Sequence, residues 1–158
     1  MLRREFLISA SAFLGLAACT FRPVHWQGGA ALPPFDIKYS GGDRFDNVIA
    51  SETQRAIALY DRRDGDIYGL DLASSIRITS SDEDSSGFDV GRNIFVTINY
   101  RLTDPNGTLL RDGVERADDS YTTSASSLSD RETEEEMVRR LIRECLTRAM
   151  TMISVSAK

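Results

Sequence analysis

The chain has 158 residues, with 19 lysines and arginines against 24 aspartates and glutamates and a formal net charge of −5. This length suffices for one domain with its own core and is short for two. The acidic balance argues against a role in binding nucleic acid, whose phosphates select basic proteins. It also argues against broad adhesion to anionic headgroups, although a local basic patch remains compatible with it.

The first 18 residues have the pattern of an export signal. Arg3 and Arg4 form a positive start, and the following run, 6–16, is largely apolar and uncharged. That run is too short for a permanent membrane span, which needs about 20 residues. The next positions, Leu16-Ala17-Ala18-Cys19, match the lipobox of bacterial lipoproteins. We therefore expect residues 1–18 to be a lipoprotein signal peptide and Cys19 to become the lipidated first residue of the mature protein.

The export route stays open on the sequence alone. The pair Arg3-Arg4 resembles a twin-arginine signal, but the general secretory route uses the same positive charge. In Gram-negative bacteria an aspartate after the acylated cysteine typically retains a lipoprotein at the inner membrane, so Thr20 implies the outer membrane. Several acyl chains, palmitate among them, would make release negligible, since each buried methylene contributes about 0.8 kcal/mol.

Residues 19–34 lack a hydrophobic period and contain Gly28-Gly29 and Pro33-Pro34. This composition is typical of a linker, so we expect a lipidated tether over 19–34 and a folded domain over 35–158.

The domain begins with a predicted strand and helix. Apolar and polar residues alternate over 35–39, which indicates a short strand. Asp43 can then cap a helix whose apolar residues recur at mostly helical spacing over 45–60, before Gly65 closes the segment.

Three further strands are predicted. Apolar residues fall on even positions over 70–78, and over 94–102 the alternation is unbroken. Asp104-Pro105-Asn106-Gly107 indicates a turn, so the returning strand, which starts with Leu110 and Val114, should form an antiparallel hairpin. Because the apolar set lies mainly on even positions in all three strands, one face of the sheet is predicted to be buried.

The C-terminal segment predicts a long helix. Ser129 or Asp130 can cap it, and the acidic residues of 132–136 complement its N-terminus. An apolar stripe then runs over 137–153 and includes Cys145, which we expect to be a small buried hydrophobe rather than a reactive thiol.

The element order β-α-β-β-β-α predicts an α+β fold. Its simplest form is a two-layer sandwich, with two helices packed on one face of a four-stranded, mostly antiparallel sheet. Strand and helix should share one core that includes Val96, Ile98, Tyr100, Leu141 and Ile142.

Patterns of catalysis or metal binding are missing from the sequence. His25 is the one histidine and falls in the expected tether, and Asp82-Glu83-Asp84 lacks the spacing of a calcium loop. Zinc motifs, phosphate-binding glycine loops and a nucleophile elbow are also missing. We therefore expect a binding or structural protein, with no enzymatic activity, cofactor or metal site.

Short motifs spread over nearly the whole chain resemble the LptE family of lipopolysaccharide-assembly lipoproteins. In chain order they are Phe21-Arg22-Pro23 directly after the lipobox, then the β-α unit, Tyr100-Arg101-Leu102-Thr103-Asp104, the Gly107 turn, Ser120-Tyr121 and the long C-terminal helix. The first of them is typical of the alphaproteobacterial type.

The resemblance implies a lipid-anchored outer-membrane protein that faces the periplasm and a barrel lumen. It would plug and help to assemble the β-barrel LptD, and it would assist insertion of lipopolysaccharide into the outer leaflet. Its partners would then be LptD and lipopolysaccharide. The alternative is a periplasmic accessory lipoprotein that scaffolds a transporter or envelope complex without binding glycolipid.

Arg77, Arg101 and Arg111 are the candidate contact residues for glycolipid or barrel. All three are at odd positions, so if the even positions of these strands face the helices, the three arginines point away from them. Guanidinium groups bind phosphate and carboxylate in forked geometry, and lipopolysaccharide carries both kinds of group. The ordinary alternative is that exposed strands carry arginine for solubility and to guard edges, and one bulge would rotate a residue to the opposite face.

Overall fold

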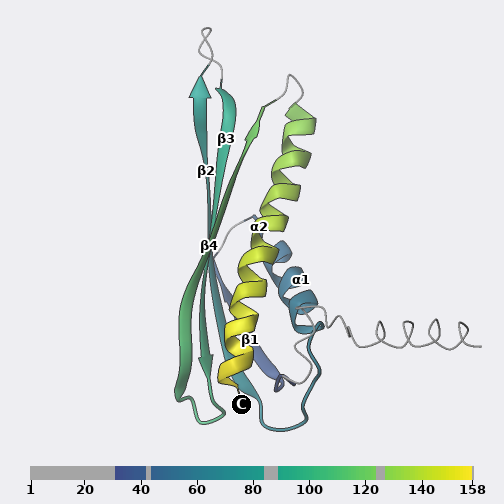
Figure 1. The fold of residues 1–158 in the computed structure, drawn as a ribbon, viewed down its shortest axis with the longest axis vertical. Helices are drawn as coiled ribbons and strands as arrows, with labels where there is room; N and C mark the ends of the chain where they lie inside the picture. Colours follow the sequence, from purple (N-terminus) through teal and green to yellow (C-terminus); the bar gives the residue numbers. More distant parts are fainter. Residues whose placement is uncertain (1–30, 42–43, 84–88, 124–126, 158) are drawn as a thin grey trace, which may run out of the picture.

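The computed structural model describes residues 31–41, 44–83, 89–123 and 127–157. The elements within them are β1 (Phe35–Ser40), α1 (Asp46–Ile57), β2 (Tyr68–Glu83), β3 (Asp89–Thr103), β4 (Leu109–Thr122) and α2 (Ser127–Ser156). Both helices lie on one side of the sheet and leave its other side open (Figure 1). The predicted fold class and the order β-α-β-β-β-α are therefore confirmed.

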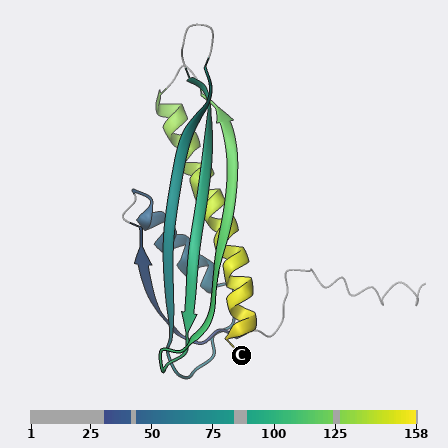
Figure 2. The ribbon, with the colours of Figure 1, turned by 90° about the vertical axis from the view of Figure 1, so that its left-hand side faces the viewer.

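The sheet has the strand order β1-β2-β3-β4. β1 is parallel to β2, because the chain crosses over through α1 between them, and the other two pairs are antiparallel. β1 pairs only with the first part of β2, from Tyr68 to Ala73. The long strands β2 to β4 therefore extend well past β1 (Figure 2).

The predicted turn between β3 and β4 is confirmed. The Oδ1 atom of Asp104 accepts hydrogen bonds from the backbone nitrogens of Thr108, at 2.7 Å, and Asn106, at 2.9 Å. The hydrogen bond from Thr108 contributes most to lowering the pKa of the Asp104 carboxyl, and the bond from Asn106 adds to it. Gly107 has φ +84°, a backbone conformation that side chains other than glycine's rarely adopt.

A register shift directly after this turn determines which side chains of β4 face the helices. Thr103 pairs with Leu109, whereas Leu102 pairs with Arg111, so one extra residue is inserted into β4. Every later residue of β4 is thereby moved to the opposite face of the sheet. The prediction that the even positions of β4 face the core is wrong, and Leu110 and Val114 are 41% and 47% exposed.

The core lies between the sheet and α2, as predicted. The residues expected to share it are all buried in one cluster: Val96, Ile98, Tyr100, Leu141 and Ile142. α2 lies over β3 and β4, and α1 packs beside α2. Gly113 lies opposite Tyr100 on the helix side, where an added Cβ would fall 2.5 Å from the ring carbon Cζ, so the tyrosine fills the space that the glycine leaves.

Two predicted helix caps do not fit the structure. α2 begins at Ser127, so Ser129 and Asp130 lie inside its first turn instead of before it. For α1 the N-cap residue is Phe45, without a side-chain hydrogen bond, and the expected cap Asp43 lies outside the described residues. α1 ends at Ile57, well before Gly65.

The chain enters the domain at the end where α2 terminates, which we call the base. Leu32 is 1% exposed, donates to the carbonyl of Asp61 at 2.8 Å and accepts from the backbone nitrogen of Arg63 at 2.9 Å. The Nη2 atom of Arg63 donates in turn to the carbonyl of Ala157 at 3.1 Å, so a loop arginine caps the C-terminus of α2. The packed part of the chain thus includes Leu32.

In the described part of the chain, neither helix has the length and apolar character that crossing a bilayer requires.

Candidate functional site: the uncovered face of the sheet

The face of the sheet opposite the helices presents rows of mostly polar side chains across the strands. Successive rows follow from the register: Asp71, Arg101 and Asp112; Ala73, Asn99 and Val114; Ser75, Thr97 and Arg116; Arg77, Phe95 and Asp118. Two of the three predicted arginines, Arg77 and Arg101, are on this face and exposed, as expected.

Arg101 lies in a hollow of about 420 Å³ on this face. It is directly opposite Asp71 on one side and Asp112 on the other, and both aspartates line the same hollow. Ala73 in the next row also lines the hollow. The hollow therefore combines one guanidinium group with two carboxylates, which makes it dipolar rather than simply basic.

Arg77 is held at the other end of the same face. Its guanidinium carbon lies 4.8 Å from the centre of the Phe95 ring, the geometry of a cation-π contact. Asp118 is opposite Phe95 on the far side of that row. The contact places the guanidinium over the ring, and the Arg77 side chain remains exposed at the surface.

The structure corrects the placement of Arg111. Because of the register shift, Arg111 is opposite the buried Leu102 and faces α2, where its Nη1 lies 3.5 Å from the Oγ of Ser156. Its Nη2 is 3.6 Å from the sulfur of Met152. Arg111 thus fastens the last turns of α2 to β4 and is not part of the uncovered face.

Arg116 takes the place on the uncovered face that Arg111 was expected to have. It is exposed, and its row is adjacent to the row of Arg77. Its backbone carbonyl accepts a hydrogen bond from Nη1 of Arg148 at 2.9 Å, which fixes this part of the edge strand to α2. Arg116 is an even position of β4, which the sequence pattern assigned to the buried face, so only the register shift revealed that it lies on the uncovered face.

The arginines form a spaced array and do not converge on one pocket. Arg101 is four residues along β3 from the row of Arg116, which corresponds to about 13 Å at strand geometry. Arg77 and Arg116 are one row apart but on strands separated by β3. Such an array suits a ligand or partner with several anionic groups, and not one small anion.

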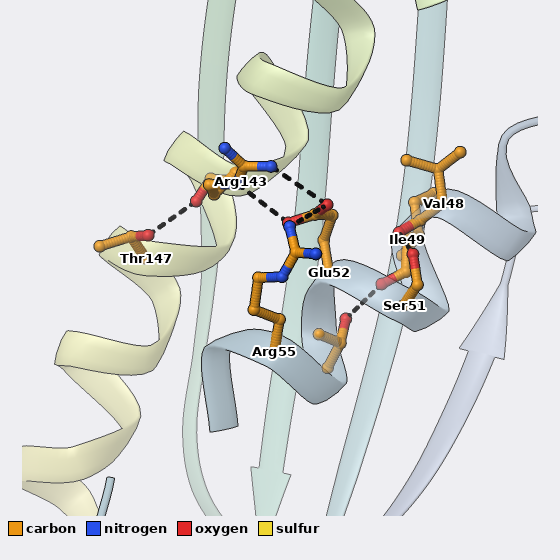
Figure 3. A network of polar contacts seen from close by, with 8 residues as sticks. Val48, Ile49, Ser51, Glu52, Arg55, Arg143 and Thr147 are labelled. Atoms are coloured by element: carbon orange, nitrogen blue, oxygen red, sulfur yellow. Dashed lines mark hydrogen bonds and ion pairs between the residues drawn. The ribbon is translucent and has the colours of Figure 1, made fainter. Parts of the chain in front are cut away.

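On the helix side, a carboxylate joins α1 to α2 (Figure 3). Glu52 is 2% exposed and accepts from Nε of Arg143 at 3.0 Å and from its Nη2 at 3.2 Å. Arg55, one turn further along α1, donates to the same carboxylate at 3.1 Å. The hydrogen bonds from Arg143 lower the pKa of Glu52 despite its burial, and the carboxylate in turn raises the pKa of Arg143.

Further polar contacts hold the first half of α2 in place. Glu134 pairs with Arg44, just before α1, and accepts from the hydroxyl of Tyr121 at 3.3 Å. Burial raises the pKa of that hydroxyl, and the charge of Glu134 adds to the effect. Arg140 pairs with Asp119 of β4 at the edge of a second hollow of about 510 Å³. These side chains fasten elements together, so we assign them to the framework.

The described residues contain no group of three or more histidine, cysteine, aspartate or glutamate side chains placed to hold a metal ion. Cys145 is buried, and burial raises the pKa of its thiol to about 11, as suits the predicted small hydrophobe. Cys19 and His25 lie outside the described residues.

Comparison with known proteins gives one family and several structural neighbours. The family model described as "LptE: Lipopolysaccharide-assembly" matches residues 30–153. No match was found among curated proteins.

Three of the structural neighbours are described as bacterial lipoproteins. A minor lipoprotein from Acinetobacter baumannii has a TM-score of 0.57 at 14% identity, covering 75% of this chain and 90% of its own. A lipoprotein from Caulobacter crescentus has a TM-score of 0.57 at 15% identity, and the match covers 75% of this chain and 88% of the other. Rare lipoprotein B from Shewanella oneidensis has a TM-score of 0.55 at 10% identity, and the match covers 75% of this chain and 93% of the other. At such identities the likeness establishes the shared fold.

Proposed function

The chain belongs to the lipopolysaccharide-assembly family LptE, a family of non-enzymatic envelope lipoproteins, and on this premise we propose its specific role. It is an outer-membrane lipoprotein that plugs the lumen of the β-barrel LptD, helps that barrel to assemble and assists insertion of lipopolysaccharide into the outer leaflet. The observation that carries the proposal is the family match over 30–153, which includes every strand and all but the end of α2.

The shape of the domain supports a role as an insert in a barrel. It is long and narrow, with α2 and the three long strands running along the same axis (Figure 1). The 30 residues of α2 correspond to about 45 Å, which exceeds the roughly 30 Å thickness of the hydrocarbon core that a barrel crosses. The ion pairs between α1 and α2 and between α2 and β4 would keep such an insert rigid.

The lipid anchor is part of the proposal. Cys19 would carry the acyl chains, and Thr20 after it would direct the protein to the outer membrane. Mass spectrometry of the protein purified from membranes should show acylation at Cys19, and Cys19→Ser should yield unprocessed or soluble protein. An unacylated wild-type chain would remove the basis for this localisation.

The uncovered face is proposed as the contact surface for glycolipid or for acidic groups of the barrel. Arg77, Arg101 and Arg116 place three cations along it at separations that suit several phosphates or carboxylates. Asp71 and Asp112 beside Arg101 reduce the attraction of this face for negative charge. The face would therefore select a ligand with separated anionic groups over a uniformly negative surface.

One purification experiment separates this role from the alternative. The full chain, tagged at its C-terminus, is extracted from its native membranes in mild detergent, and stoichiometric partners are identified. We expect an outer-membrane β-barrel together with lipopolysaccharide. Recovery of a different envelope complex, without a barrel and without glycolipid, would instead support the accessory scaffold. As a control, Leu141→Ala weakens the core and should lower the yield without changing the identity of the partner.

A further inference from the structure

Large apolar side chains are exposed at the base of the domain. They come from three different parts of the chain, and we call them the basal rim: Ile67, Leu109, Leu110, Met152 and Val155, which are between 41% and 61% exposed. Scattered single leucines on a surface are ordinary, but a set that gathers at one end of a molecule marks a contact surface.

The contacts place the basal rim at one end. Leu109 is opposite Thr103, and Thr103 is opposite Gly69, two residues after Ile67. Across the layers, Arg111 reaches Met152 and Ser156, so the last turns of α2 lie over the start of β4. Figure 1 shows the β3–β4 turn and the C-terminus of α2 together at this end.

The segment that leads to Cys19 joins the domain at the same end. Leu32 is hydrogen-bonded between Asp61 and Arg63, and Arg63 binds the carbonyl that terminates α2. Twelve peptide units separate Cys19 from Ala31, and a chain of that length spans at most about 43 Å. The base is therefore tied to within this distance of Cys19, whereas the start of α2 is about 45 Å further along the helix.

We propose that the basal rim rests on the surface of the lipid bilayer that holds the acyl chains of Cys19, with its apolar side chains at the boundary between headgroups and acyl chains. The inference rests on the lipidation of Cys19 under the proposed function, and it describes the anchored protein before it enters a barrel, whose wall would separate a domain in the lumen from the bilayer. The loop at the base carries Arg62 and Arg63 but also three aspartates, at 61, 64 and 66. The contact is therefore directed to zwitterionic headgroups and should depend little on salt, because apolar contact and not net charge supplies the attraction.

The test places a fluorescent label either at the base or at the opposite end of α2 in the full lipidated chain. Single substitutions Val155→Cys and Leu110→Cys label the basal rim, and Leu128→Cys labels an exposed leucine at the opposite end of the helix, which is 67% exposed. Cys145 is buried and does not compete for the reagent. Each labelled protein is reconstituted into phosphatidylcholine and phosphatidylethanolamine vesicles that carry a quencher on a fraction of the headgroups.

We expect quenching several-fold stronger at 110 and 155 than at 128, and unchanged at high salt. Equal quenching at all three positions, or none at the two basal positions of protein that floats with the vesicles, would overturn the inference while leaving the lipid anchor intact. Protein that does not float at all would overturn the anchor and the inference together. The labels at 110 and 155 could also stay unquenched on vesicles and become shielded from solvent in a purified complex with the barrel. That result would assign the basal rim to the barrel and overturn the inference as well.

Discussion

Glu52 of α1 and Arg143 of α2 form a two-point ion pair in which one partner is buried and the other is not. The side chain of Glu52 is 2% exposed, whereas that of Arg143 is 50% exposed. The pair joins the two helices above the sheet (Figure 3). Because the burial is so unequal, the loss of each partner has a different cost.

Arg143→Met should destabilise the protein more than Glu52→Gln. The first change leaves a buried carboxylate with Arg55 as its remaining close cation, and an under-compensated buried charge costs about 3 kcal/mol. The second leaves Arg143 free to turn into water, which costs about 1 kcal/mol. Urea unfolding at pH 7 measures both, with Arg131→Met, an exposed arginine in the first turns of α2, as control. A larger loss for Glu52→Gln would contradict the assignment of the buried partner.

The same carboxylate should make stability depend on pH. Hydrogen bonding to Arg143 lowers the pKa of Glu52 below its ordinary value of 4.5, so the folded state binds this proton more weakly than the unfolded chain. Its contribution is complete above pH 4.5 and is lost as the pH falls through the lowered pKa. The stability difference between wild type and Glu52→Gln should therefore shrink between pH 5 and pH 3. A constant difference over this range would show that ionisation of Glu52 is irrelevant to the fold.

Substitutions in the hairpin test the register of β4. Ile98→Ala and Leu141→Ala each remove a fully packed side chain and should cost about 2 to 5 kcal/mol. Val114→Ala, on the uncovered face, should change stability by less than about 0.5 kcal/mol. If Val114→Ala were as damaging as Ile98→Ala, then β4 would have its even positions in the core after all.

The arginines of the uncovered face and Arg111 on the helix side should respond to substitution in opposite ways. The triple change of Arg77, Arg101 and Arg116 to Ser should weaken binding of lipopolysaccharide or barrel and leave the thermal transition nearly unchanged, because no core contact is lost. Arg111→Ser should do the reverse, lowering the transition by a few degrees with binding retained, because Arg111 fastens the end of α2. Binding assays and calorimetry on both variants check this. A triple variant that binds like wild type would leave these arginines as surface charge.

Cys145 should be unreactive in the folded protein. Burial raises the pKa of its thiol to about 11, and the side chain has no exposed surface, so neither thiolate nor access is available at pH 8. Titration with a thiol reagent should show this residue reacting only after unfolding in urea, at the rate of the global transition. Rapid labelling under native conditions would indicate that the middle of α2 opens locally.

Local patterns were sufficient wherever a single element or a short turn carried the information. The alternation over 94–102 predicted β3 because a half-buried strand must place successive side chains on opposite faces. The apolar stripe over 137–153 predicted α2 for the corresponding helical reason. In the turn, Asp104 and Gly107 predicted the reversal because one supplies the acceptor and the other the left-handed conformation.

Contacts between elements could not be predicted in this way. The inserted residue between the pairs Thr103–Leu109 and Leu102–Arg111 reverses the phase of β4, although Leu110 and Val114 look like core positions in the sequence. Without the insertion Leu110 would oppose Leu102 and face the helices. The role of Glu52 was equally hidden, because its partner Arg143 is 91 residues away along the chain.

The sequence by itself therefore determined the element order, the fold class, the buried faces of β3 and α2, and the family to which the chain belongs. Only the tertiary structure decided that Arg116 and not Arg111 lies on the uncovered face, that Glu52 fastens the helices, and that Leu32 is clamped at the base. The physical reason is that hydrophobic periodicity is a property of one segment, whereas strand register and ion pairing are settled between segments, where a shift of one residue exchanges the two faces of a strand.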